Sequence, residues 1–139
     1  MKKILILIIV ITCISYPVFS DKNGVSVSLS GFDYFSLGIG YSWCDTDFGD
    51  TLFSSITSGV MLEYSTDNEI TARLYGQYCN GIIFGFSPLF VTDFDDYSFG
   101  FALEAGLGIP SLAITYRYNF YSDSKFNCHQ IGILHSYFD

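Results

Sequence analysis

Basic residues are scarce, and lysine is missing from the whole stretch between Lys22 and Lys125. The chain carries six lysines and arginines against fourteen acidic residues, for a formal net charge of −8. A surface that binds nucleic acid needs cationic side chains at the phosphates, so this shortage argues against nucleic acid as a partner. Cys-x-x-Cys and His-rich spacings are also missing, and structural metal sites use such spacings. The sequence therefore predicts no metal and no other cofactor.

Long apolar runs are lacking after the first twenty residues. No later stretch approaches the roughly 20 apolar residues that a membrane-spanning helix needs. The beginning, MKKILILIIVITCISYPVFS, combines Lys2 and Lys3 with an apolar segment and ends in Val18-Phe19-Ser20, which is typical of a secretory signal peptide. We expect a signal peptide at 1–20 and one mature domain at 21–139, and any membrane crossing by that domain must use strands.

What the chain does contain is apolar residues in strict alternation. Half of the sequence is apolar and 19% is aromatic, which excludes a disordered chain despite its charge. From Tyr97 to Ile109 every odd position is apolar and every even position is small or polar, and the alternation resumes after Pro110-Ser111. This pattern, with turn residues between the segments, is typical of antiparallel strands. The eight segments expected are 25–30, 34–43, 54–65, 69–78, 82–91, 97–109, 112–120 and 126–138. A meander of about eight strands predicts an all-β, antiparallel up-and-down barrel.

The composition of the two faces decides between a soluble barrel and a transmembrane barrel. The solvent face of a soluble barrel is rich in Lys, Glu, Gln and Arg, but here the second face is mostly Gly, Ser and Ala. A transmembrane barrel points its large apolar residues at lipid and keeps small or polar residues inside. The sequence therefore predicts a transmembrane β-barrel. The expected lipid-facing residues are Phe35, Leu37, Ile39, Tyr41, Trp43, Phe99, Phe101, Leu103, Leu107, Ile114, Tyr116 and Tyr118.

Charge pairing on the small-residue face supports this orientation. A two-residue turn at Pro110-Ser111 places Glu104 opposite Arg117, and a turn at 66–68 makes Glu63 a diagonal neighbour of Arg73. A lone charge in a narrow lumen is costly unless an opposite charge compensates it. We therefore expect two ion pairs in the lumen, although ion pairs between neighbouring strands also occur on soluble sheets.

The mature sequence resembles the small eight-stranded outer-membrane β-barrel proteins of Gram-negative bacteria. The resemblance rests on the signal peptide, the alternation and the last segment, IGILHSYFD, in which Phe138 resembles the terminal aromatic residue that the assembly machinery reads. It implies a location in the bacterial outer membrane, with membrane lipid and the assembly machinery as partners. It also implies a structural or surface-interaction role with a filled lumen rather than an open pore. The alternative is a soluble barrel, periplasmic or secreted, that binds a small apolar ligand.

Catalytic residues are not evident. Some barrels of this size hydrolyse acyl chains of lipid A or phospholipid and resemble serine hydrolases with a His-x-Ser sequence. Here His135 and Ser136 are adjacent, and adjacent strand residues point to opposite faces. We expect no enzymatic activity, with an acyl-chain hydrolase as the minor alternative.

Two further features of the sequence raise the question of a calcium site and of a disulfide. Acidic residues cluster at 45–50 and 93–96, where we expect solvated turns because neither cluster has the glycine and closing glutamate of a calcium loop. Cys44 and Cys79 follow strands that run in the same direction, so a disulfide between them is possible. Cys128 is expected at the opposite rim.

Overall fold

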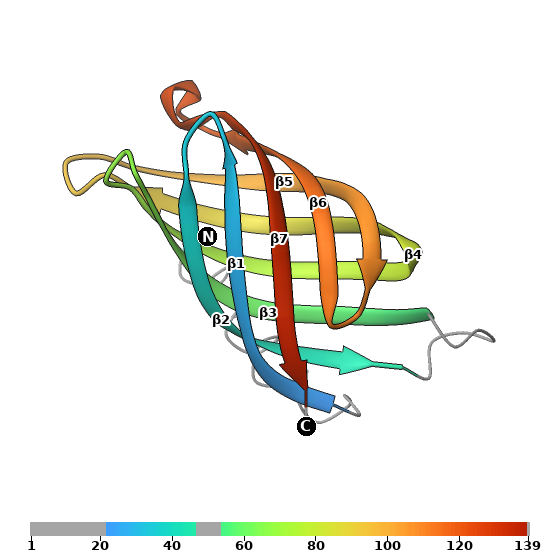
Figure 1. Cartoon of the computed structure of the whole chain (residues 1–139). Coiled ribbons are helices and arrows are strands. Elements are labelled where there is room, and N and C mark those ends of the chain that lie inside the picture. The colour runs from blue at the N-terminus through green and yellow to red at the C-terminus, as the bar shows by residue number, and fades with distance from the viewer. Residues whose placement is uncertain (1–21, 47–53, 139) are drawn as a thin grey trace, which may run out of the picture.

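The chain forms an all-β closed barrel of antiparallel strands in up-and-down order (Figure 1). The computed structural model describes residues 22–46 and 54–138, so the expected signal peptide lies outside the described residues. Each strand pairs with the next, and the last pairs with the first. The predicted fold class is therefore confirmed. The elements are β1 (Lys22–Phe32), β2 (Ser36–Asp45), β3 (Ser54–Ser65), β4 (Ile70–Thr92), β5 (Tyr97–Ile109), β6 (Leu112–Tyr121), the 3-10 helix η2 (Ser124–Phe126) and β7 (Cys128–Phe138).

β4 combines the fourth and fifth expected segments. Its residues 70–80 pair with β3, and its residues 81–92 pair with β5. Gly81 has a φ of +76°, which glycine adopts without steric cost, and Figure 1 shows the ribbon turning back on itself there. A Cβ on Gly85 would lie only 3.2 Å from the carbonyl oxygen of Gly76, so the two halves lie side by side. The barrel wall therefore contains six single strands and the two arms of β4.

β1 is longer than the expected 25–30. Lys22 pairs with Cys44 of β2, and at the other end Phe32 pairs with Gln130 of β7. These pairings extend the strand to 11 residues, which reaches the roughly 9–11 residues of a transmembrane strand. β7 is shorter than expected at its start, because Phe126 belongs to η2.

The two edges of the barrel differ in what they carry. We call the edge where β1 begins and β7 ends the terminal rim. The opposite edge, with connections 33–35, 66–69, 93–96 and 122–127, is the loop rim. Among the described residues, no helix is long and apolar enough to cross a membrane.

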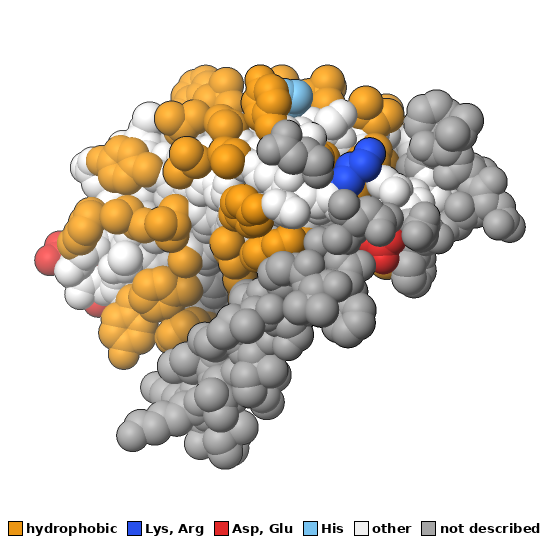
Figure 2. Space-filling view, turned by 90° about the horizontal axis from the view of Figure 1, so that it is seen from below, with side chains coloured by type: hydrophobic (Ala, Val, Ile, Leu, Met, Phe, Trp, Pro, Cys, Tyr) orange, Lys and Arg blue, Asp and Glu red, His pale blue; other side chains and the backbone are white. Residues whose placement is uncertain are grey.

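The large apolar side chains point outward, and the small and polar ones point into the lumen. Phe99 is 55% exposed and Leu103 is 52% exposed, whereas serines such as Ser26 and Ser42 are completely buried. All twelve residues that were expected to face lipid lie on the outer face of the barrel, and two of them, Trp43 and Tyr118, are half-buried there. In Figure 2 hydrophobic side chains are spread widely over the described part of the face in view, with few charged side chains among them. This distribution is the reverse of that in a soluble barrel.

Outward aromatic residues lie near both rims, and the middle of the outer face carries aliphatic residues together with some aromatic ones, such as Phe86 and Tyr118 opposite Leu103. The aromatic residues near the loop rim include Phe32, Phe35, Tyr64, Tyr97 and Phe120, and those near the terminal rim are Tyr41, Trp43, Tyr78 and Tyr137. At the loop rim many rings touch, as in the contact of Phe101 with Phe120 at 5.0 Å between centroids. The middle of the outer face carries Val27, Ile39, Leu62, Leu103 and Ile133, among others.

Candidate functional site

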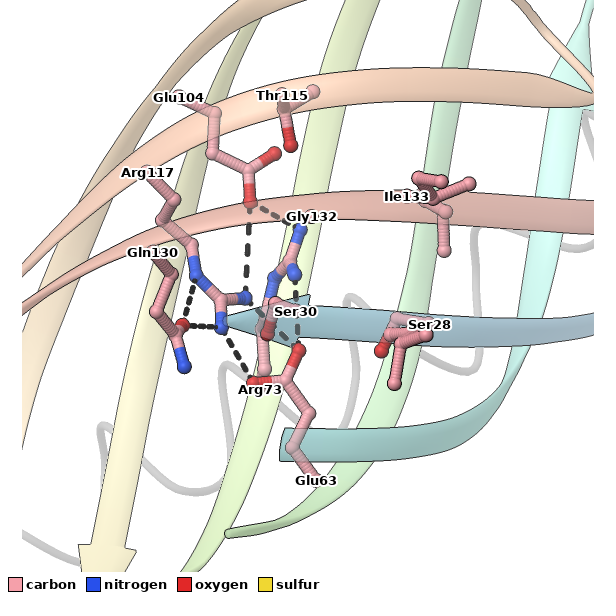
Figure 3. A pocket seen from close by; sticks show the side chains of 12 residues that line it. Ser28, Ser30, Glu63, Arg73, Glu104, Thr115, Arg117, Gln130, Gly132 and Ile133 are labelled. Carbon is pink, nitrogen blue, oxygen red and sulfur yellow. Dashed lines mark hydrogen bonds and ion pairs between the residues drawn. The ribbon is translucent and has the colours of Figure 1, made fainter. Parts of the chain in front are cut away.

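Four charged side chains meet in the middle of the lumen (Figure 3). Glu63 comes from β3, Arg73 from the first arm of β4, Glu104 from β5 and Arg117 from β6. The alternation of the strands turns each of them inward, and each is at most 5% exposed. Two carboxylates and two guanidinium groups give the cluster a net charge of zero, which a buried group of charges requires.

The shortest contacts cross the lumen. Arg117 donates through Nη1 and Nη2 to the two carboxylate oxygens of Glu63, at 2.9 and 2.6 Å. Arg73 Nη2 pairs with Glu104 Oε1, and Arg73 Nη1 lies 3.2 Å from Glu63 Oε1. The bidentate geometry makes the Arg117–Glu63 contact both strong and directional.

The register also places each arginine near its expected glutamate, and each arginine contacts the other glutamate as well. Glu104 lies directly opposite Arg117, yet their closest charged atoms are 3.8 Å apart. Arg73 lies opposite Met61, which makes it a diagonal neighbour of Glu63. Both expected ion pairs therefore form, and two further contacts between Arg117 and Glu63 and between Arg73 and Glu104 join them in one cluster of four charges. The physical reason is closure, since long side chains that point toward the barrel axis reach the opposite wall as easily as the adjacent strand.

Neutral polar side chains complete the cluster. Gln130 Oε1 accepts from Arg117 Nε at 2.9 Å, Gln77 Nε2 donates to Glu104 Oε2 at 2.5 Å, and Ser87 Oγ accepts from Arg73 Nε at 3.2 Å. These hydrogen bonds satisfy donors and acceptors that would otherwise be buried without partners. None of these three residues stood out in the sequence. The alternation along each strand does place them on the lumen side. Each also lies close to a charged residue on the same strand or on the next one.

Apolar side chains lie on both sides of the charged cluster along the lumen. Toward the terminal rim they include Met61, Ile83 and Leu134, and toward the loop rim Leu89, Val91, Ala102, Tyr121 and Phe126. A cavity of about 20 Å³ beside the cluster, lined in part by Ser28, Ser30 and Thr115, has room for about one water molecule. The lumen is thus filled along the described residues, and the charges are held away from bulk water.

The three described cysteines are free thiols. The suggestion of a disulfide between Cys44 and Cys79 is therefore wrong. Cys44 lies opposite Thr57 of β3, and Cys79 lies opposite Ser55 of the same strand. β3 therefore separates them, and two strand spacings of about 4.8 Å each exceed the roughly 7 Å between Cα atoms that a disulfide can bridge.

We therefore expect that oxidation will form no intramolecular disulfide in the folded barrel. Non-reducing electrophoresis of folded protein, before and after treatment with a mild oxidant, should show the same mobility. The Cys44→Ser variant is the matched control, and a band shift in the parent that this variant abolishes would contradict the expectation.

The residues near the end of β7 divide between the two faces. His135 lies on the outer side, where its Nδ1 is 2.8 Å from the carbonyl oxygen of Ser111. Ser136 points inward, with its hydroxyl 2.7 Å from that of Ser26. The structure therefore does not bring this histidine and serine together. Phe138 has the inward parity, and Tyr137, 66% exposed, is the last outward aromatic residue.

The acidic turn between β4 and β5 is partly neutralised from within the protein, by Lys125 and by backbone N–H groups. Asp93 Oδ1 accepts from the backbone N–H groups of Asp96 at 2.7 Å and Asp95 at 3.1 Å. Lys125 Nζ contacts Asp96 Oδ2 at 2.6 Å and Asp93 Oδ2 at 3.2 Å. The backbone N–H of Asp96, with Lys125, lowers the pKa of Asp93, and hydrogen bonding to Asp96 raises the pKa of Lys125. In the other acidic stretch, Asp47 and Asp50 lie outside the described residues.

No protein-family model matches this chain, and no curated protein matches it either. A solved structure from work on the de novo design of transmembrane β-barrels is similar to it at 12% identity, covering 85% of this chain and 97% of that one with a TM-score of 0.49. The barrel architecture described above rests on the strand pairing itself.

Proposed function

We propose that this chain is a small bacterial outer-membrane β-barrel protein with a structural or surface-interaction role and a filled lumen. The observation that carries the proposal is the reversed distribution of side chains, with Phe, Leu, Ile and Val outside and Ser, Gly, Gln and paired charges inside. In water such an outer surface would be one continuous apolar patch, which soluble monomers rarely expose. In a bilayer the same surface is solvated by acyl chains.

The arrangement of outward aromatic residues supports a bilayer as the surrounding medium. Transmembrane barrels carry aromatic residues at both membrane interfaces and aliphatic residues between them. Here aromatic residues lie near both the loop rim and the terminal rim, and the middle between them is apolar, with aliphatic residues and a few aromatic ones. Lipid is therefore the partner that we propose for the outer face, and the assembly machinery of the outer membrane is the partner that we propose during insertion.

The filled lumen supports a role other than that of a pore. A barrel of this size has room for side chains but not for a continuous aqueous channel, and this lumen holds the charged cluster between apolar layers. The positions of His135 and Ser136 on opposite faces support a non-catalytic role as well. The loops and rims then remain as the surfaces available for interaction.

Membrane fractionation with heat-modifiable electrophoresis tests the proposal. The full chain, expressed with its own beginning, should sediment with the outer membrane and need detergent for extraction. Unboiled samples should migrate differently from boiled ones, because a closed barrel resists unfolding in detergent until it is heated. A periplasmic soluble protein expressed in parallel is the control for leakage. Recovery in the soluble periplasmic fraction without detergent would instead support a soluble barrel that binds an apolar ligand.

A further inference from the structure

The connection between β6 and β7 sends one side chain into the mouth of the barrel. Residues 122–125 are exposed, whereas Phe126 is only 3% exposed. Its ring packs with Leu89, Val91 and Ala102, and lies 6.1 Å from the ring of Tyr121 in an edge-on arrangement. Phe126 therefore fills an apolar recess at the loop rim, in the manner of a plug.

Exposed polar contacts hold this connection over the mouth. Lys125 bridges Asp93 and Asp96 on the connection between β4 and β5, and the backbone N–H of Asp123 donates to Ser98 Oγ at 3.0 Å. Ion pairs at exposed positions contribute about 0–1 kcal/mol each and weaken with salt. The two ion pairs of Lys125 are thus weak and sensitive to salt, unlike the buried charges farther down the lumen.

Next to the plug lies a polar group with an unused acceptor, Asn119, which is opposite Ala102 in the sheet, one of the residues around Phe126. Cys128 Sγ contacts the hydroxyl of Tyr34 at 3.0 Å and the amide nitrogen of Asn119 at 3.2 Å. Asn119 is 1% exposed, and its Oδ1 accepts no hydrogen bond from any residue that the structure describes. A buried acceptor without a partner is unfavourable, and a donor that enters from above would remove that cost.

We propose that the mouth at the loop rim is a binding site for a small aromatic ligand with one hydrogen-bond donor, and that Phe126 occupies this site in the closed state. Lys125, Asp93 and Asp96 form the latch. When the latch opens, the connection lifts Phe126 out, and the ligand takes the place of its ring with the donor directed at Asn119 Oδ1. The charged cluster below remains intact, so ligand binding opens no channel. This site does not depend on the proposed membrane role, because its walls and its latch are described independently of the outer face.

The accessibility of Cys128 reports on the plug. In a Cys44→Ser/Cys79→Ser background, Cys128 is the single described thiol, and it is 3% exposed at the start of β7, two residues after Phe126. A water-soluble maleimide added to the folded barrel should label it slowly. Loss of two exposed ion pairs in Lys125→Ala should raise the labelling rate roughly two- to tenfold, since labelling follows the open population. Molar salt should do the same to the parent, and Lys22→Ala at the terminal rim should leave the rate unchanged.

The Phe126→Ala variant separates the plug from the latch and allows a ligand to be tested. Its labelling should be more than about tenfold faster than that of the parent, because the apolar contacts of the ring are lost. Indole, an aromatic ring with one N–H donor, should slow this labelling about threefold or more by occupying the recess, by mass action. Indene has the same shape without the donor, partitions into detergent in a similar way and should protect much less.

Each result bears on one part of the proposal. Unchanged labelling in both Lys125→Ala and high salt overturns the latch. Slow labelling of Phe126→Ala overturns the plug, and fast labelling that indole does not slow, or that indene slows equally, overturns the ligand class. Phe120→Ala, which removes an outward ring near the same rim, is the matched control for general loosening of the barrel and should label at the rate of the parent.

Discussion

Replacement of Arg117 by methionine is expected to destabilise the folded barrel by about 3–5 kcal/mol, the usual cost of removing one partner from a buried group of charges. Arg117 neutralises Glu63 through two hydrogen bonds and also faces Glu104. Without it, Arg73 alone balances two buried carboxylates, and Gln130 loses the guanidinium that it accepts from. Methionine keeps much of the length and volume of the side chain, so the lost stability reports the charge rather than a cavity.

The matched control is the double variant Arg117→Met/Glu63→Gln. It removes one charge of each sign and leaves Arg73 paired with Glu104, so the lumen is again neutral. Because residues in one network do not contribute additively, we expect the double variant to be more stable than Arg117→Met alone. Urea titrations of the folded barrel in lipid vesicles would measure the free energy of unfolding of both variants. Equal stabilities for the parent and Arg117→Met would show that the cluster is hydrated rather than sealed.

The second large effect is expected on the outer face. Leu103 lies in the middle of β5 and Ile109 at its end, and both point outward. An arginine at the midplane of a bilayer costs about 2–4 kcal/mol, but only about 0–1 kcal/mol near the interface. Leu103→Arg should therefore lower the free energy of unfolding much more than Ile109→Arg, on the same strand and the same face.

The dependence of the effect on depth distinguishes a transmembrane barrel from a soluble one. On a soluble barrel both arginines would lie in water, and substitutions at exposed positions usually change stability by less than about 0.5 kcal/mol. The measurement is the urea midpoint of each variant in vesicles. Two small and equal shifts would contradict the proposed membrane location without affecting the barrel fold.

Much of the fold could be predicted from the sequence, because strand alternation is a local property. The third and sixth expected segments, 54–65 and 97–109, coincide with β3 and β5. The ends of β1 could not be predicted from the sequence, because Lys22 and Phe32 belong to the strand only through their pairing with residues of β2 and β7. The turn at Gly81 was expected from Cys79-Asn80-Gly81, although the extended structure continues through it as one element, β4.

The charged cluster was predictable only in part. Register within a hairpin follows from the length of its turn, so the position of Glu104 opposite Arg117 could be counted from Pro110-Ser111. The contact of Arg117 with Glu63 joins β6 to β3, which are not neighbours in the sheet, and it depends on how tightly the sheet curls. The burial of Phe126 could not be predicted either, because it depends on how the connection between β6 and β7 folds back over the end of the barrel. Cys44 and Cys79 share a rim, as expected, and the strand that separates them is the expected segment 54–65, so the order of the meander already placed them two strands apart.

The contact between β6 and β3 also constrains the order of assembly. Arg117 and Glu63 come together only when a growing sheet has bent into a ring. While that ring is open, both groups must keep their hydration shells, and the sheet cannot shed its water strand by strand. We therefore expect seam formation between β7 and β1 and dehydration of the interior to occur in one cooperative step.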